Sequence, residues 1–227
     1  KGKPYLQQLG ADENGNPMAT REDVERDADF LVNNRLQGRQ IDVNGTSKNV
    51  VYVSFAMINN HIDKRALQYA AMVRKNSDAT QVSRSLIFAI IKIESAFNPY
   101  AVSSAPAYGM MQLVPHSGGR EAYRKAKGLD ESPTREYLFD AGNNIELGTA
   151  YLNVLTYNQL EPVANSVSRE YCVISAYNTG PGNVLRTFSK DRVAAVNAIN
   201  SLSPSTVYQK LRTGLPYEET RHYLYKV

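Results

Sequence analysis

The chain has 227 residues, of which 42% are hydrophobic and 21% charged, and its formal net charge is +4. This composition is typical of a folded chain with one sizeable domain, or with one domain and a small appendage. The single cysteine, Cys172, excludes an intramolecular disulfide, the scattered Lys and Arg argue against a nucleic-acid-binding stripe, and no apolar run is long enough to span a membrane. The three histidines lie far apart in the sequence and form no metal-binding motif.

Residues 1–60 predict a small α/β segment that begins with a loop rich in Gly, Asn, Asp and Pro. A helix is predicted over 20–36, with Thr20 as its N-cap and Asp23 in the first turn, where an acid suits the helix dipole. Further on, β-rich residues stand on both sides of Asn44-Gly45. This dipeptide favours a tight two-residue turn, so we expect a hairpin here.

Residues 61–227 have the pattern of an all-helical domain built from short helices. Apolar residues recur at helical spacing, and the links between them are rich in Gly, Pro, Ser and Asn. The helix that begins at Ser83 is expected to stop near Asn98-Pro99, because proline disfavours helix at the residue before it. The predicted helices cover 65–75, 83–96, 118–127, 141–157, 169–177, 184–188, 193–199, 206–212 and 218–225.

Glu94 is an acid on the apolar face of the helix predicted over 83–96. At 100° per residue, Ile87 lies at about +20° from Glu94, Ile90 at about −40° and Ile91 at about +60°. The only lysine of this helix lies nearly opposite, at about 160°. The carboxyl group of Glu94 is therefore expected to face the protein interior.

Two effects are expected to raise the pKa of Glu94. Burial disfavours the ionised form, and the negative end of the helix dipole repels a carboxylate in the last turn. A carboxyl group that is protonated near neutral pH suits general-acid cleavage of a glycosidic bond. The alternative is a buried structural acid paired with an arginine or with backbone amides, and this helix alone favours neither reading.

Four short motifs follow one another from Glu94 to the end of the chain. They are Glu-Ser-Ala-Phe-Asn-Pro at 94–99, Gly-Met-Met-Gln at 109–112, Ala-Tyr-Asn-Thr-Gly at 176–180 and Glu-Thr-Arg-His-Tyr at 219–223. In this order they resemble the motifs of the lytic transglycosylases of the Slt family, whose catalytic domain is related to goose-type lysozyme. The second motif has Met where the family has Leu, which is a volume-conserving change.

The likeness covers about residues 62–227, and the stretch 138–152 is most similar to the membrane-bound type C members of the family. The resemblance implies a mainly α fold, with a lysozyme-like catalytic domain over 61–227 behind the small N-terminal α/β segment. It also implies cleavage of the β-1,4 bond between N-acetylmuramic acid and N-acetylglucosamine in peptidoglycan. One residue, Glu94, would act first as acid and then as base, leaving a 1,6-anhydro end without consuming water. No metal or organic cofactor is implied.

Most glycosidases use two carboxylates at a set separation. We find no second acid at a matching position in the four motifs, and Asp63, Asp140 and Glu146 are candidates by residue type only. A neighbouring acetamido oxygen of the sugar could assist in place of a second carboxylate. The sequence therefore predicts a site with a single catalytic acid.

The resemblance places further residues beside Glu94. Ser103 is expected to bond the catalytic carboxyl or a sugar, although a loop serine often bonds its own backbone instead. Met111 is expected to pack on a sugar face or in the core, and Gln112 to bind sugar hydroxyls, since an amide both donates and accepts. Tyr177 is expected to place its hydroxyl close to Glu94.

Asn178 and Tyr223 complete the predicted substrate site. Asn178 begins a turn, so contact with a sugar competes with a role as turn former or helix cap. Tyr223 lies on an amphipathic terminal helix, where lining the cleft and packing in the core fit the sequence equally well.

Two other functions fit these residues: a goose-type lysozyme hydrolase, which needs a carboxylate to activate water, and a non-catalytic glycan-binding module. The expected partner is the glycan strands of peptidoglycan, which implies a periplasmic location; the oligomeric state is left open. The type C likeness implies an outer-membrane anchor, a lipid on a cysteine upstream of this chain, as the only membrane contact. The sequence begins at Lys1 and shows no signal peptide, so we expect a targeting segment to be missing from it.

Overall fold

The computed structural model describes residues 9–227, and the chain divides into two compact units between Leu67 and Gln68. Part of the loop expected at the start of the chain, residues 1–8, lies outside the described residues. Helix α2 (His61–Thr80) runs through the boundary between the units.

The N-terminal unit contains helix α1 (Arg21–Asn34), which begins where the sequence predicts. Thr20 accepts a hydrogen bond from the backbone N–H of Asp23, and the Asp23 carboxylate accepts one in return from the backbone N–H of Thr20 at 2.9 Å. This reciprocal pair satisfies two N–H groups that the first turn would otherwise leave without partners. The predicted N-cap is confirmed.

Two small antiparallel sheets complete the N-terminal unit. Strands β2 (Gln37–Val43) and β3 (Thr46–Tyr52) form a hairpin, and β1 (Gly10–Ala11) pairs with β4 (Ala56–Met57). Asn44 and Gly45 connect β2 to β3 with φ values of 55° and 77°. Positive φ at both positions is what the tight hairpin turn requires, so the predicted hairpin is confirmed.

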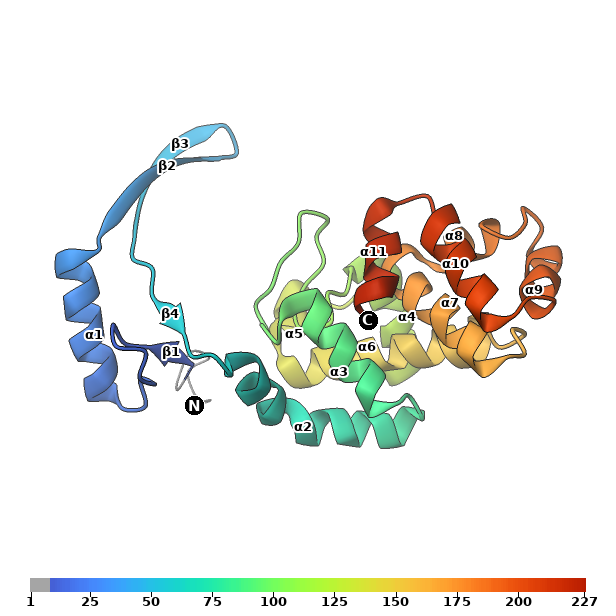
Figure 1. Cartoon of the computed structure of the whole chain (residues 1–227), viewed down its shortest axis with the longest axis horizontal. Helices are drawn as coiled ribbons and strands as arrows, with labels where there is room; N and C mark the ends of the chain where they lie inside the picture. The colour runs from blue at the N-terminus through green and yellow to red at the C-terminus, as the bar shows by residue number, and fades with distance from the viewer. Residues whose placement is uncertain (1–8) are drawn as a thin grey trace. The chain divides into compact units, whose positions relative to one another are not determined.

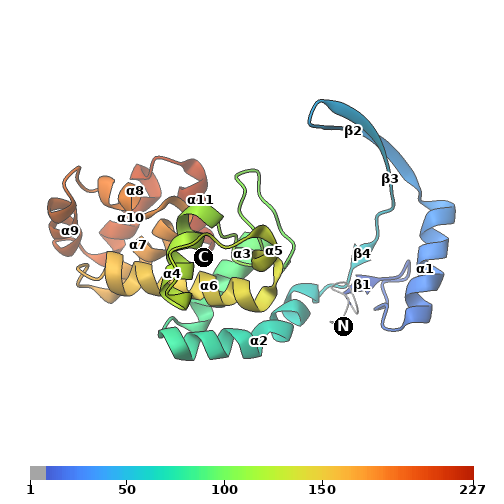
Figure 2. The ribbon, with the colours of Figure 1, turned by 180° about the vertical axis from the view of Figure 1, so that it is seen from behind.

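The C-terminal unit is a cluster of short helices, and the predicted mainly α class is confirmed. Opposite views show α6 running through its middle (Figures 1 and 2). Helix α6 packs against α4, α5 and α7, and α7 packs against α8, α10 and α11. After α2 the helices are α3 (Arg84–Ser95), α4 (Arg120–Lys127), α5 (Arg135–Phe139), α6 (Ala141–Val154), α7 (Ser166–Thr179), α8 (Pro181–Arg186), α9 (Arg192–Asn200), α10 (Pro204–Gly214) and α11 (Glu218–Lys226), with single π-helical turns η1 (Pro115–Gly119) and η2 (Leu155–Gln159).

The helix predicted over 83–96 is confirmed to within one residue at each end, but Asn98-Pro99 is not what stops it. The helix ends at Ser95, because Ala96 and Phe97 both adopt left-handed backbone conformations, with φ values of 48° and 62°. A left-handed residue after the last turn is a common way for a helix to end. This reversal turns Phe97 into the core, where 2% of it is exposed.

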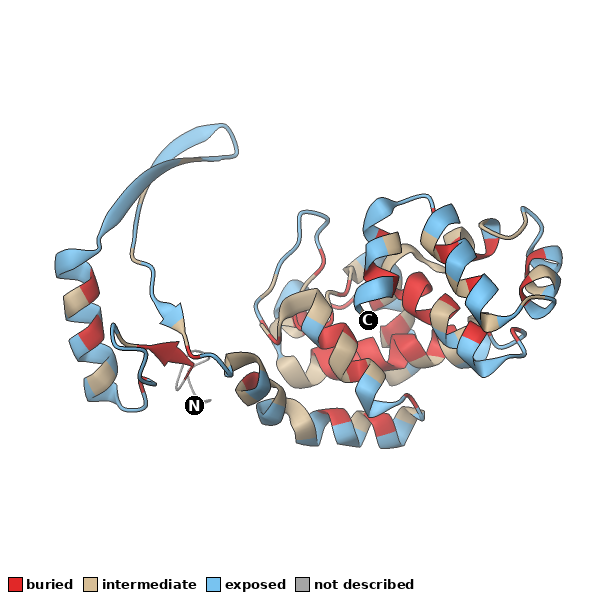
Figure 3. Cartoon of the chain, viewed as in Figure 1, coloured by how far each residue is buried: buried red, intermediate tan, exposed pale blue. Residues whose placement is uncertain are grey.

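The core of the C-terminal unit lies along α3, α6 and α7, where buried residues concentrate (Figure 3). Helix α6 is buried on almost every side from Asn144 to Leu152. A helix that is apolar nearly all round must be enclosed by other elements. Helix α5, which the sequence pattern did not predict, is a short turn capped by Thr134 that precedes α6.

Candidate active site

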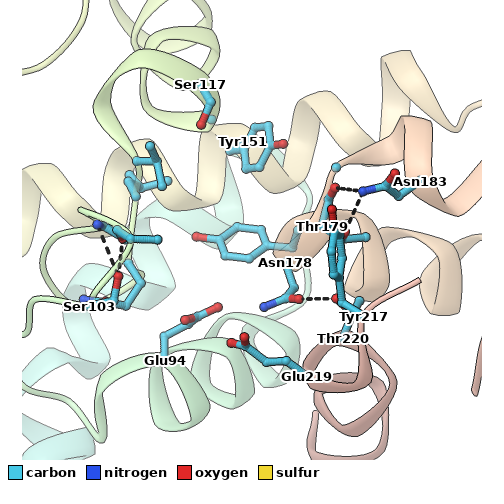
Figure 4. Close-up of a pocket in the computed structure, with 18 residues that line it drawn as sticks. Glu94, Ser103, Ser117, Tyr151, Asn178, Thr179, Asn183, Tyr217, Glu219 and Thr220 are labelled. Atoms are coloured by element: carbon cyan, nitrogen blue, oxygen red, sulfur yellow. Dashed lines mark hydrogen bonds between the residues drawn. The ribbon is translucent and has the colours of Figure 1, made fainter. Parts of the chain in front are cut away.

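The C-terminal unit contains a pocket of about 520 Å³ whose walls come from segments far apart in the sequence. Helix α3 contributes its last turn, and α6, α7 and α11 contribute one or more side chains each (Figure 4). Five of the predicted site residues line this pocket: Glu94, Ser103, Gln112, Tyr177 and Asn178. Folding therefore brings together residues from three of the four sequence motifs, and the fourth adds Glu219 and Thr220.

Glu94 stands in the last turn of α3 and faces inward, as the helix geometry predicts. The isoleucines Ile87, Ile90 and Ile91 on the same face are fully buried, whereas Lys92 is exposed. Burial is the main cause that raises the pKa of Glu94, from its ordinary value of 4.5 to about 7. The carboxyl group of Glu94 is therefore partly protonated near neutral pH.

Two residues of α11 shift the pKa of Glu94 in opposite directions. The hydroxyl of Tyr223 lowers the pKa of Glu94, and the negative charge of Glu219 raises it. The Tyr223 side chain is 5% exposed, and its hydroxyl forms no hydrogen bond of regular geometry with any described group. Tyr223 is therefore a buried neighbour of the Glu94 carboxyl and does not line the open pocket.

Glu219 is an acidic residue of the pocket that the sequence analysis did not predict. Its carboxylate and that of Glu94 both point into the pocket, one from α11 and one from α3 (Figure 4). The pocket therefore contains a second carboxylate, and the expectation of a single catalytic acid stays a prediction. Asp63, Asp140 and Glu146, the acids considered from the sequence, do not line it. The available signal was the position of Glu219 in the same motif as Tyr223.

Ser103 and Gln112 line the pocket from the loop that follows α3, and both bond backbone groups of their own segment. The Ser103 hydroxyl donates to the carbonyl of Ala105 and accepts from the N–H of Ala107 at 3.3 Å. The Gln112 amide nitrogen donates to the carbonyls of Ala101 at 3.1 Å and Gly109 at 2.8 Å. These bonds stabilise the loop that carries both side chains, and they leave the Gln112 side-chain oxygen as the acceptor available to a ligand.

Tyr177 is buried at the base of the pocket, where its hydroxyl donates to the backbone carbonyl of Met111 at 2.8 Å. Burial raises its pKa well above the ordinary value, and the charge of Glu94 adds to that shift. The hydroxyl hydrogen is engaged by Met111, so Tyr177 offers Glu94 a neutral oxygen. This arrangement agrees with the expected proximity of Tyr177 to Glu94.

The Met111 side chain is placed in the core and not in the pocket. It is 0% exposed and packs against Gly148 of α6, where an added Cβ would lie 2.3 Å from the Met111 sulfur. Of the two roles considered for Met111, the structure therefore shows core packing. Its backbone carbonyl, which holds Tyr177, is what it contributes to the site.

Asn144 anchors the loop that carries Met111 and Gln112. Its side-chain oxygen accepts from the N–H of Met111 at 2.7 Å, and its nitrogen donates to the carbonyls of Tyr108 at 2.9 Å and Leu138 at 2.8 Å. Asn144 is 0% exposed. One buried amide thus bonds three backbone groups, two of which belong to the buried residues Met111 and Leu138.

Asn178 stands at the end of α7 and bonds neither its own turn nor a helix end with its side chain. Its side-chain oxygen accepts a hydrogen bond from the hydroxyl of Thr220 on α11 at 2.6 Å. The turn-forming role considered from the sequence is therefore not what its side chain does. Thr220 is 1% exposed.

Comparison with known families identifies the C-terminal unit. The model of the transglycosylase SLT domain matches residues 71–200. The chain belongs to the SLT transglycosylase family. A second family model, the N-terminal domain of membrane-bound lytic murein transglycosylase C, matches residues 1–68.

Individual relatives agree with this assignment. The chain is 45% identical over 226 residues to membrane-bound lytic murein transglycosylase C of Shigella sonnei and 47% identical to that of Klebsiella pneumoniae. Each match covers 99% of this chain and 61% of the relative, so the chain spans about three-fifths of the length of these SLT family members.

Solved structures of the SLT family share the fold of the C-terminal unit. The 70 kDa soluble lytic transglycosylase of Escherichia coli aligns with a TM-score of 0.54 and 27% identity, covering 73% of this chain and 24% of that one. An inactive mutant of Slt from Pseudomonas aeruginosa, in which a glutamate is replaced by glutamine, aligns with a TM-score of 0.51 and 29% identity over 69% of this chain and 22% of that one.

Proposed function

We propose that this chain is a peptidoglycan lytic transglycosylase that cleaves the β-1,4 bond between N-acetylmuramic acid and N-acetylglucosamine. The observation that carries the proposal is a partly buried carboxyl group, Glu94, whose pKa is raised to about 7 in a pocket of an SLT domain. The inactivity of the Pseudomonas aeruginosa Slt that has glutamine in place of a glutamate supports a glutamate as the essential group.

The proposed reaction uses Glu94 twice. First, the protonated carboxyl donates its proton to the glycosidic oxygen, and the bond to the anomeric carbon of the muramic acid breaks. The resulting carboxylate then takes the proton of the muramic acid 6-hydroxyl, whose oxygen bonds to the same anomeric carbon. The carboxyl group ends as it began, a 1,6-anhydro ring is formed, and no water is consumed.

The surroundings of Glu94 suit both steps. A pKa of about 7 leaves a comparable population of acid and base at neutral pH, so neither proton transfer is strongly uphill. The negative charge of Glu219 in the same pocket favours the positive charge that develops at the anomeric carbon. We propose that the acetamido oxygen of the sugar, and not a protein carboxylate, assists at the anomeric carbon itself.

A second candidate function is a lysozyme-like hydrolase, and one observation favours it: Glu219 is a second carboxylate in the pocket. In an inverting or retaining hydrolase a second carboxylate activates water or attacks the sugar. Digestion of purified peptidoglycan followed by mass analysis of the muropeptides separates the two functions. We expect 1,6-anhydro products; reducing-end products, heavier by one water, would establish hydrolysis and overturn the proposal.

The pH dependence of cleavage tests the link between Glu219 and Glu94. The first step needs Glu94 protonated, so kcat/KM on peptidoglycan is expected to fall as pH rises through about 7. Glu219 raises the pKa of Glu94, so Glu219→Gln lowers that pKa and moves the falling limb to lower pH. Glu218→Gln is the matched control, because the exposed Glu218 does not line the pocket. A limb that stays in place in Glu219→Gln would show that the two carboxylates are not coupled.

For the chain as a whole we propose a catalytic domain over 61–227 and, over 1–60, part of an accessory domain. Peptidoglycan lies outside the cytoplasmic membrane, so we propose a periplasmic location. The relatives named membrane-bound support attachment to a membrane, and we propose that a lipid anchor outside this chain provides it. Within residues 9–227, no helix combines the length and the apolar character needed to cross a bilayer.

A further inference from the structure

The hydrogen bond between Thr220 and Asn178 joins the two helices that meet at the pocket. The Thr220 hydroxyl donates to the Asn178 side-chain oxygen at 2.6 Å, across 42 residues of sequence. Thr220 is 1% exposed, so this donor has no access to water as an alternative. The bond lies beside Glu219, the residue before Thr220, and Tyr177, the residue before Asn178.

This bond determines which end of the Asn178 amide faces the pocket. The two ends have nearly the same size, but one is an acceptor and the other carries two donors. The oxygen is held by Thr220, so the nitrogen points into the pocket, on the side where Glu94 lies (Figure 4). Among the described residues, no protein group accepts a hydrogen bond from that nitrogen.

We propose that Thr220 is a positioning residue, which orients the Asn178 amide so that it donates to an acceptor oxygen of the sugar bound beside Glu94. The inference rests on the proposed glycan substrate. The acceptor on the sugar is an acetamido carbonyl oxygen or a hydroxyl oxygen, since these are the acceptors that an N-acetylated sugar presents. Without the Thr220 hydroxyl the amide is free to turn its oxygen to the pocket, where it would face those same acceptors.

Replacement of Thr220 by valine, which keeps the shape and removes the donor, tests the proposal. We expect Thr220→Val to raise the KM for peptidoglycan about 3- to 10-fold, the cost of one lost neutral hydrogen bond, with kcat less affected. Thr220→Ser, which keeps the hydroxyl, is expected to restore KM. The pH of the falling limb is expected to stay in place in both variants, because Glu219 and Tyr223 keep their positions.

A purely structural role for Thr220 predicts a different result. If the hydroxyl only held α11 against α7, its loss would displace Glu219 and Tyr223 and would shift the pH profile. A shifted profile, or an unchanged KM in Thr220→Val, would overturn the proposal. Thr213→Val is the matched control, since the Thr213 hydroxyl bonds the carbonyl of Gln209 within its own helix, away from the pocket.

A double-mutant cycle shows whether Thr220 acts through Asn178. Asn178→Ala removes the amide, so Thr220→Val is expected to cause no further rise of KM in that background. A full additive effect would contradict the inference. Cleavage by the wild-type chain is measured in parallel: if it does not cleave peptidoglycan, the proposed function fails, whereas cleavage with an additive cycle rejects only the role of Thr220.

Discussion

Glu94→Gln is expected to lower the rate of peptidoglycan cleavage by about 10²- to 10⁴-fold, the usual contribution of a positioned acid or base. Glutamine has the shape of the neutral acid but can neither donate nor accept the proton, so the variant lacks both the acid of the first step and the base of the second. The measurement is release of soluble muropeptides at pH 6 to 7, where Glu94 is substantially protonated. Undiminished release would show that Glu94 is not the catalytic acid and would place the chemistry on another group of the pocket.

Stability provides the control for this variant. The pKa of Glu94 rises from 4.5 in the unfolded chain to about 7 on folding. Below pH 4.5 both states hold the proton; between pH 4.5 and 7 the unfolded state releases it first, so the wild-type protein loses stability as pH rises. Glutamine does not titrate, so Glu94→Gln does not lose stability in this way. Its free energy of unfolding is expected to exceed that of the wild type by on the order of 1–3 kcal/mol at pH 8. Urea unfolding at pH 5 and pH 8 measures the difference, and an inactive but more stable variant excludes misfolding.

Asn144→Ala is expected to destabilise the protein by about 2–4 kcal/mol, because it removes the side-chain partner of the buried N–H of Met111 and of the buried carbonyl of Leu138. The carbonyl of Tyr108 loses one of its two donors and keeps the N–H of Leu113 at 3.1 Å. Loss of the anchor also frees the loop that carries Gln112, so activity is expected to fall even at temperatures where the variant stays folded.

Asn143→Ala is the matched control for this change. Asn143 precedes Asn144 on α6, is only partly buried, and takes part in the helix cap through its backbone N–H, which alanine retains. Asn143→Ala is expected to lower the free energy of unfolding by less than about 1 kcal/mol. Equal destabilisation of the two variants in urea unfolding would show that the buried network around Asn144 contributes little.

The local elements of this chain were predictable because short-range chemistry controls them. A threonine with an acid three residues later caps α1, and Asn44-Gly45 turns the hairpin, as the sequence predicts. The end of α3 was predicted to within one residue, but the backbone reversal that ends it was not predictable in this way. Ala96 and Phe97 take left-handed conformations that neither residue prefers alone, and burial of Phe97 in the core offsets the cost.

In the candidate site, too, some residues were predictable from the sequence and others are placed only by the structure. Glu94 could be found from one helix, because its angular position among Ile87, Ile90 and Ile91 needs only the helical repeat. Ser103, Gln112, Tyr177 and Asn178 came from motifs, and the structure brings them to one pocket. The side chain of Met111 lies instead in the core, since Gly148 leaves a space on α6 that only the fold reveals.

The sequence by itself determined the helical class, the cap of α1, the hairpin and the inward direction of Glu94, all of which depend on neighbours within a few residues. Only the tertiary structure decided that Glu219 enters the pocket, that Thr220 holds Asn178 and that Asn144 anchors the loop. Asn144 and Met111 lie 33 residues apart, and Thr220 and Asn178 lie 42 residues apart. No local periodicity in the sequence relates residues at such separations. Their geometry follows from the packing of α6, α7 and α11 around one core, which sets the distances between side chains that the chain itself leaves undetermined.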